Sequence, residues 1–207
     1  MTEKILAAIK ELREKSKRRN FVQTFDLIVN LKDIDLKKPE NRFTEDLILP
    51  HGKGKEAKIV IFADAIKEGE VGCPVLNSSD IEVLAKNKRE AKKLIRKTDF
   101  FLAEPKLMPT IGKNLGQFLG PRGKMPKVIT GDVKKLVESY KKSIRIRLKE
   151  SPVIQCAVGN EEMEDEKVAE NVKAVLEFLE SKLPKGKGNI ASVLLKLTMS
   201  KPVKLEV

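Results

Sequence analysis

The feature that most constrains the fold is a change in the pattern of apolar residues along the chain. Near both ends, strand-like segments alternate apolar and polar residues, as in FVQTFDLIVNLK (21–32) and SIRIRLK (143–149). In the middle, IVIFA (59–63) and FFLA (100–103) are apolar without interruption. Alternation is typical of a sheet with one buried face, whereas unbroken apolar strands are typical of a parallel sheet covered on both faces. The chain therefore predicts two different sheets.

This change predicts an α/β fold with two domains. An α+β, sandwich-like domain is built from both termini (1–55 and 143–207), and a Rossmann-like α/β domain (56–142) is inserted into it. In the first domain we expect an amphipathic helix that ends at Asn20, a hairpin of 143–149 with 153–158, a long helix and a last strand. In the insert, strands alternate with helices, one of them capped by Ser78 or Ser79.

The charge of the chain predicts a polyanionic partner. Its 42 Lys and Arg against 30 Asp and Glu leave a net charge of +12, which favours nucleic acid first and an anionic membrane surface second. The charge is uneven, because 86–97 holds seven basic residues and one acid. No apolar run approaches the roughly 20 residues of a membrane span. Cys73 and Cys156 lack metal-ligand neighbours and are interpreted as reduced thiols of a cytoplasmic protein.

The glycine-rich segment IGKNLGQFLGPRGKMPK (111–127) suggests a phosphate-binding loop but does not match one. Such a loop needs a glycine where Phe118 stands and a hydroxyl where Met125 stands. Gly112, Gly116 and Gly120 recur every four residues, so we interpret Gly112 and Gly116 as sites of close helix packing. The turn 120–124 has two open interpretations, a contact with an RNA backbone or a solvated turn; its residues are Arg122, Gly123 and Lys124.

No catalytic arrangement is recognisable, so we expect no enzyme activity, cofactor or metal. The single histidine, His51, lies in a Gly-Lys loop, and the serines lack a base partner. Nucleic-acid binding has more support, because Arg145, Arg147 and Lys149 alternate on one strand face as a basic ridge. The polar face of the first strand is expected to line the same surface, with Thr24, Asp26 and Asn30. Few aromatic residues are present, which favours a structured RNA over stacked single strands.

At this point several segments resemble a known family. MPTIGKNLGQFLGPRGKMPK is similar to the signature of the universal large-subunit ribosomal protein numbered one, and NFVQTFDLIVNLKDIDLKKPENR, LPHGKGK and LTMSKPV extend the match over nearly all of the chain. The sequence LKDIDLKKPENR (31–42) resembles that of archaeal members. The resemblance implies an RNA-binding domain of both termini, a Rossmann-like insert, and a two-strand hinge at His51, Gly52, Gly54 and Lys142. It also implies a lateral stalk protein that binds a large-subunit rRNA junction, helps deacylated tRNA leave the exit site, and represses its own mRNA.

The resemblance also implies individual RNA-binding residues. Phe21 matches the family's invariant aromatic residue, and Thr198 and Met199 match its Thr-Met pair. Thr24, Asp26 and Arg147 fall on its RNA-facing strands. The match departs at Ser200 and Lys201, where the commonest continuation is Gly-Pro; Ser200 loosens the closest backbone approach, while Lys201 adds a phosphate partner. We expect a non-enzymatic rRNA-binding protein, monomeric when free. The alternatives are a nucleotide-dependent enzyme in the insert and a non-specific RNA chaperone.

Overall fold

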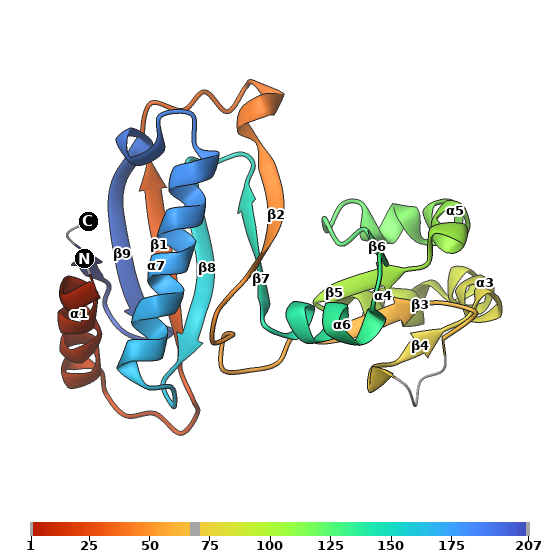
Figure 1. The fold of residues 1–207 in the computed structure, drawn as a ribbon, viewed down its shortest axis with the longest axis horizontal. Coiled ribbons are helices and arrows are strands. Elements are labelled where there is room, and N and C mark those ends of the chain that lie inside the picture. Colours follow the sequence, from red (N-terminus) through yellow and green to blue (C-terminus); the bar gives the residue numbers. More distant parts are fainter. Residues whose placement is uncertain (1, 67–70, 206–207) are drawn as a thin grey trace. The chain divides into compact units, whose positions relative to one another are not determined.

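A computed structural model describes residues 2–66 and 71–205 (Figure 1). The chain divides into two compact units: unit 1 is Met1–Glu56 with Lys142–Val207, and unit 2 is Ala57–Lys141. These limits differ by one residue at each crossing from the expected domain limits. The mixed α/β architecture with two kinds of sheet is confirmed.

Unit 1 is organised around a four-stranded antiparallel sheet in the order β10-β9-β1-β8. Its strands are β1 (Thr24–Leu31), β8 (Val153–Asn160), β9 (Ile190–Leu197) and β10 (Val203–Leu205). The expected alternation in β1 is confirmed, because Phe25, Leu27 and Val29 are fully buried and the residues between them are half-buried. The buried face shares one core with α1 (Thr2–Lys15) and α7 (Asp165–Lys182), and Figure 1 shows α7 running along this sheet.

A second, two-stranded sheet of unit 1 pairs β2 (Phe43–Ile48) with β7 (Ser143–Leu148). The predicted hairpin between 143–149 and 153–158 is therefore wrong. β8 instead pairs with β1, and this pairing places its apolar residues Ile154 and Val158 in the same core as Leu27. The first helix also ends at Lys15 rather than Asn20, because no apolar residue recurs on its buried face beyond Leu12.

Unit 2 contains a parallel sheet in the order β4-β3-β5-β6, a doubly wound arrangement. Every residue of β3 (Ile59–Phe62) and β5 (Phe100–Ala103) is buried, as the unbroken apolar runs predict. The edge strands β4 (Val75–Leu76) and β6 (Lys127–Val128) are short. One face of the sheet shares a core with α3 (Ser78–Lys86), α4 (Lys88–Lys97) and α5 (Met108–Leu119), and the other with α6 (Val133–Lys141).

Two local predictions in unit 2 are corrected. Helix α3 is capped by Asn77 in a capping box with Asp80, not by Ser78 or Ser79. A Cβ added at Gly112 or Gly116 would meet no atom within 4 Å. Close packing therefore does not require these glycines, and α5 is held to the core by its other face, including Ile111. The described residues also include short 3-10 helices at Pro39–Asn41, Pro105–Leu107 and Gly186–Asn189.

Candidate nucleic-acid interface

Two segments far apart in sequence meet at one end of the unit 1 sheet. One connects α1 to β1 and the other connects β9 to β10. The backbone N–H of Thr24 donates to the Thr198 hydroxyl (3.1 Å), which donates in turn to the Thr24 carbonyl (3.4 Å). The N–H of Met199 donates to the side-chain oxygen of Gln23 (3.1 Å). Side-chain hydrogen bonds thus set the position of the 198–202 loop against β1.

Gln23 is the residue of this site that the sequence analysis missed. Its side chain is buried and its Nε2 donates to the Ser16 hydroxyl (3.3 Å). Its backbone donates to a Glu161 carboxylate oxygen (3.2 Å) and accepts from the Glu161 N–H (2.8 Å). Gln23 joins the end of α1, the end of β8 and the Met199 loop. The available signal was its register, because Gln23 stands two residues before Phe25 in the buried set of β1.

Large apolar side chains are exposed around this junction. Phe21 is 50% exposed, Val22 47% and Met199 60%. A hollow of about 790 Å³ beside Met199 has five cations and one acid, Glu11, in its lining; the cations are Lys15, Lys17, Arg19, Lys201 and Lys204. A smaller hollow of about 360 Å³ adjoins Phe21 and Val22 and contains Arg18. We call segments 16–23 and 198–204 together the Phe21–Met199 surface; it combines exposed apolar side chains with several cations, and Glu161 and Glu162 lie beside Phe21.

Ser200 has an internal role at this surface. Its hydroxyl oxygen accepts from the Leu197 N–H (2.8 Å) and lies within hydrogen-bond distance of the carbonyls of Leu197 and Lys201. The Ser200 N–H also donates to the Leu197 carbonyl (3.0 Å). The serine therefore closes the turn after β9, and Lys201 beside it is exposed.

The open face of the four-stranded sheet offers fewer free groups than its sequence suggests. The Asn30 amide donates to the Ser192 hydroxyl (2.8 Å). Partial burial raises the pKa of Asp26, and the charge of Lys196 on the neighbouring strand partly opposes this rise. Burial, with the Asp26 charge, raises the pKa of the Cys156 thiol to about 12. This cysteine therefore stays protonated and unreactive at neutral pH.

The predicted basic ridge on β7 is wrong for Arg145. Its guanidinium is 2.7 Å from the Asp46 carboxylate, and the two side chains are only 11% and 7% exposed. Arg147 is exposed, and its pKa is lowered by partial burial and by Arg145, with Asp46 opposing. Lys149 is exposed in the turn that leads to β8, whose first residue pairs with Asn30. Arg147 and Lys149 thus lie toward the opposite end of β1 from Thr24, away from the Phe21–Met199 surface.

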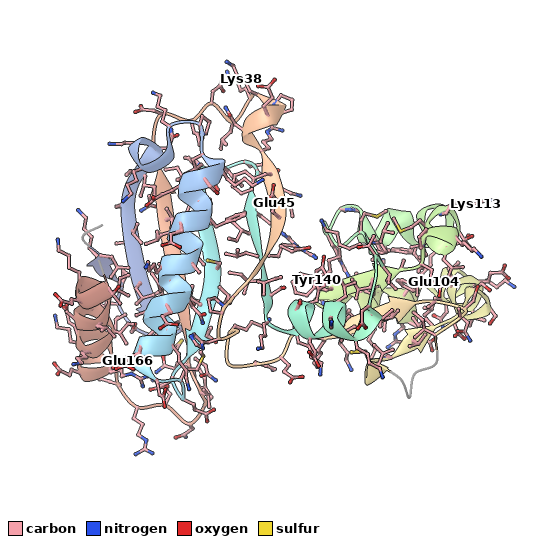
Figure 2. All side chains as sticks on the ribbon, viewed as in Figure 1. Lys38, Glu45, Glu104, Lys113, Tyr140 and Glu166 are labelled. Carbon is pink, nitrogen blue, oxygen red and sulfur yellow. The ribbon has the colours of Figure 1, made fainter. Side chains whose placement is uncertain are left out.

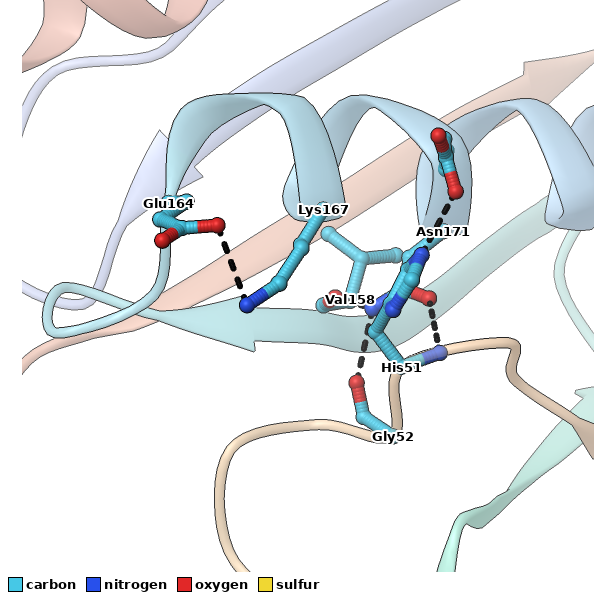
Figure 3. Close-up of polar contacts among 7 residues, drawn as sticks. His51, Gly52, Val158, Glu164, Lys167 and Asn171 are labelled. Atoms are coloured by element: carbon cyan, nitrogen blue, oxygen red, sulfur yellow. Dashed lines mark hydrogen bonds and ion pairs between the residues drawn. The ribbon is translucent and has the colours of Figure 1, made fainter.

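The expected hinge loop is held firmly within unit 1 by Asn171 of α7, which is fully buried (Figure 3). The Asn171 amide accepts from the His51 N–H (3.2 Å) and donates to the carbonyls of Gly52 (2.7 Å) and Val158 (2.8 Å). The imidazole of His51 also lies 2.5 Å from a Glu170 carboxylate oxygen. Three contacts thus connect this loop to α7, and a fourth connects Asn171 to β8.

The glycines of this loop are required by its geometry. Gly52 and Gly54 have φ values of +66° and +79°, which favour glycine. A Cβ at Gly54 would also collide with the side chain of Asn160. Lys142 lies beside Gly52 and accepts from the Leu49 N–H through its carbonyl (3.2 Å). The sequence LPHGKGK therefore encodes a tight, specifically bonded loop.

The turn 120–124 fixes the C-terminal end of α4, which neither earlier interpretation anticipated. The Lys124 ammonium donates to the carbonyls of Ile95 (2.9 Å) and Thr98. The Arg122 guanidinium donates to the Lys92 carbonyl (3.3 Å), and Gly123 takes a φ of +60°. A cation at a helix C-terminus is favourable because the last carbonyls carry partial negative charge. Both basic side chains are thus engaged within unit 2.

Carboxylates occupy the position where a doubly wound sheet binds nucleotides, the carboxyl ends of the strands at the switch in strand order. Asp64, after β3, accepts from the Ser78 N–H at the start of α3 (2.8 Å). Glu104, after β5 (Figure 2), accepts from the Ala65 N–H (3.3 Å). Negative charge here repels phosphate. In 2–66 and 71–205, no three potential ligands are grouped to hold a metal ion, and no helix of these residues is long and apolar enough to cross a membrane.

Comparison with known proteins decides the family. The model of the ribosomal protein L1p/L10e family matches residues 12–201. The chain belongs to this family. L1-family relatives named "Large ribosomal subunit protein uL1" are 48% identical in Pyrococcus horikoshii, 47% in Thermococcus kodakarensis and 43% in Methanobrevibacter smithii. Each alignment covers 99% of this chain, and 96%, 97% and 100% of the respective relative. L1-family members are structural ribosomal proteins rather than enzymes, as the sequence predicted.

Membership in the L1 family gives the glycine-rich segment a context. The segment MPTIGKNLGQFLGPRGKMPK, which carried the resemblance, forms α5 and the turn that fixes α4. Arg122 and Lys124 of this segment thus stabilise the α/β unit of this L1-family chain, while the Phe21–Met199 surface lies entirely in unit 1.

Proposed function

We propose that this L1-family protein is a cytoplasmic component of the large ribosomal subunit that binds a junction in its rRNA through the Phe21–Met199 surface. One observation supports the proposal most strongly: Thr198 and Met199 form hydrogen bonds with Thr24 and Gln23. Exposed apolar side chains and cations surround these bonds. Net charge +12 supplies long-range attraction to a polyanion.

The arrangement suits a folded RNA in three ways. The fixed Met199 loop presents the Thr198 hydroxyl oxygen, whose proton goes to Thr24 and which keeps one lone pair to accept from a sugar hydroxyl. The exposed side chains of Phe21 and Met199 exclude water from those bonds, and a desolvated hydrogen bond is costly to lose. The surrounding cations, among them Lys17 and Lys201, contact the phosphate backbone without reading sequence.

The finer roles that the resemblance implies belong to the same proposal. Bound to the rRNA junction, the protein forms part of the lateral stalk and assists release of deacylated tRNA from the exit site. An mRNA of its own gene that copies the junction would compete for the Phe21–Met199 surface, so the protein would repress its own translation. When free, it is a monomer.

The test compares two substitutions of equally exposed apolar residues in the full chain. Met199→Ala and Ile48→Ala each remove a side chain that is more than half exposed, 60% and 56%, so both are expected to fold. Affinity is measured for a stalk-junction RNA and for a plain RNA duplex of equal length at the same salt concentration. Met199→Ala is expected to lower the affinity for the junction about tenfold, while Ile48→Ala leaves it unchanged.

Equal affinity of the unmodified protein for both RNAs would support the RNA-chaperone alternative and contradict the proposal. The enzyme alternative predicts saturable binding of ATP or NAD, which a thermal-shift titration of the full chain reports.

A further inference from the structure

Helix α4 presents a row of cations on its outer face. Ala91 and Ile95, one turn apart, are buried against the core of unit 2. The helical repeat therefore places Arg89, Lys93 and Arg96 on the opposite side, with Lys92 beside them. All four are exposed. Successive cations lie about one helical turn, ~5 Å, apart along the axis, so the row presents several positive charges in a line.

The structure shows no acidic partner for these charges among residues 2–66 and 71–205. Within the described part of the chain, no ion pair includes any of the α4 cations. In unit 1, by contrast, Arg13 pairs with Asp165 and Lys182 with Glu45. Like charges three or four residues apart on a helix repel one another. An external polyanion would relieve this repulsion.

The cationic helix is also held rigidly in place. Its C-terminal carbonyls are bound by Lys124 and its Lys92 carbonyl by Arg122. The Lys92 ammonium lies 6.0 Å from the centre of the Phe118 ring. A charged surface whose backbone is fixed before binding loses little conformational freedom when a ligand binds.

An apolar groove runs beside the same cations, between α3 and α4. It has a volume of about 380 Å³, and its apolar lining comes from Leu76, Val83, Leu84 and Leu94. Lys93 and Lys97 stand at its edge, together with the carboxylates of Asp80 and Glu90. Val83 is 60% exposed and forms part of this groove.

We propose that unit 2 is a second RNA-binding surface, separate from the Phe21–Met199 surface: α4 binds phosphates and the α3–α4 groove receives one unpaired base. The apolar groove suits the flat faces of a base, and Lys93 and Lys97 suit its flanking phosphates. Carboxylates at the groove edge accept hydrogen bonds from exocyclic amino groups. Unpaired bases occur in bulges and loops, so the partner is an RNA with such a feature.

The phosphate half of the proposal is tested with two fourfold variants of the full chain. Arg89→Gln, Lys92→Gln, Lys93→Gln and Arg96→Gln remove the α4 row. The control Lys58→Gln, Lys127→Gln, Lys134→Gln and Lys135→Gln removes the same charge from other exposed positions of unit 2. The probe is an RNA hairpin with a one-nucleotide bulge. The α4 variant is expected to bind at least tenfold more weakly, with a salt dependence reduced by about three ions; the control changes less than threefold.

The base-binding half is tested by Val83→Glu, which places a charge in the groove at an exposed position. It is expected to lower affinity for the bulged hairpin about tenfold and to leave an otherwise identical unbulged hairpin unaffected. Ile48→Glu, equally exposed in unit 1, is the control and changes neither.

Three outcomes would overturn this proposal. They are equal losses in the two fourfold variants, no effect of Val83→Glu on the bulged hairpin, and competition by polyglutamate as strong as by RNA, which would indicate an acidic protein partner. The stalk-junction measurement is independent of these outcomes, because the α4 variants leave the Phe21–Met199 surface intact.

Discussion

The two units of this protein place their polar groups differently. Of the buried polar residues that the structure describes, Gln23, Ser143, Asn171 and Asn189 lie in unit 1 and only Thr98 lies in unit 2. Unit 1 assembles segments from both ends of the chain, and buried amides connect them. Unit 2 is one continuous segment whose centre is unbroken apolar strand. Polar connections are thus concentrated where distant loops must be placed accurately, whereas in the described part of unit 2 the cations Arg89, Lys92, Lys93 and Arg96 of α4 form no ion pair.

The strongest test of this difference is Asn171→Ala. The change leaves the His51 N–H and the carbonyls of Gly52 and Val158 without their side-chain partner, and should lower the free energy of unfolding of unit 1 by about 3 kcal/mol. Thr98→Val, which removes a single hydroxyl–carbonyl bond in unit 2, should cost about 1 kcal/mol. Urea unfolding combined with amide exchange in β8 and β5 separates the two units. An equal loss of unfolding free energy in the two variants would contradict the difference between the units.

A second test concerns function. Thr198→Ala removes the hydroxyl that joins the Met199 loop to Thr24. We expect the affinity for a stalk-junction RNA to fall by about 1–3 kcal/mol. Binding at matched salt is the measurement, and Thr110→Ala in unit 2 is the control. An unchanged affinity would remove Thr198 from the site.

A smaller effect is expected from Lys124→Met in unit 2. The ammonium binds two carbonyls at the end of α4, and its loss should cost about 1 kcal/mol of local stability. Faster amide exchange in the last turn of α4, with β8 unaffected, is the expected result. Faster exchange throughout unit 2 would show that the turn supports the whole unit.

The smallest effect concerns pH. The folded protein raises the pKa of Asp26 above its ordinary 3.8, so the folded state holds this proton more tightly than the unfolded chain. Stability from this group is present below pH 3.8 and is lost as pH rises through the raised pKa. Asp26→Asn should therefore be slightly more stable than the original protein at pH 7 and equal to it at pH 3. Thermal unfolding of both proteins at pH 7 and pH 3 measures the difference in stability. An Asp26→Asn variant that is less stable than the original protein at pH 7 would contradict the prediction.

The sequence predicted those parts of the fold that depend on burial. The pattern of apolar residues located β1, β3, β5 and α7, because the buried face of a helix or a strand must be apolar. It did not predict which strand pairs with which. β7 and β8 adjoin in sequence, yet their partners are β2 and β1, and pairing depends on the competition among all edges. The two-residue strands β4 and β6 are too short to show any period.

The candidate interface was only partly predictable. The resemblance identified Phe21, Thr198 and Met199, and the structure brings the segments that carry them together. The sequence pattern overestimated the number of unpaired basic residues. A basic residue that alternates on one strand gives no sign of an acid on the neighbouring strand, and Arg145 pairs with such an acid, Asp46. It likewise suggested an exposed role for Lys124. Gln23 was missed because buried polar residues are rare, although it stands in register with the buried residues of β1.

The central position of β1 has a consequence for folding during protein synthesis. β1 lies between β8 and β9, which begin at Val153 and Ile190, so a nascent chain carries the unpaired strand until more than a hundred further amino acids have been added. The continuous segment Ala57–Lys141 emerges in the meantime and can form its core first. An apolar strand waiting for its partners is prone to mispairing. The rate of translation between these points, and any chaperone that shields Phe25 and Leu27, would then govern how much of the chain matures correctly.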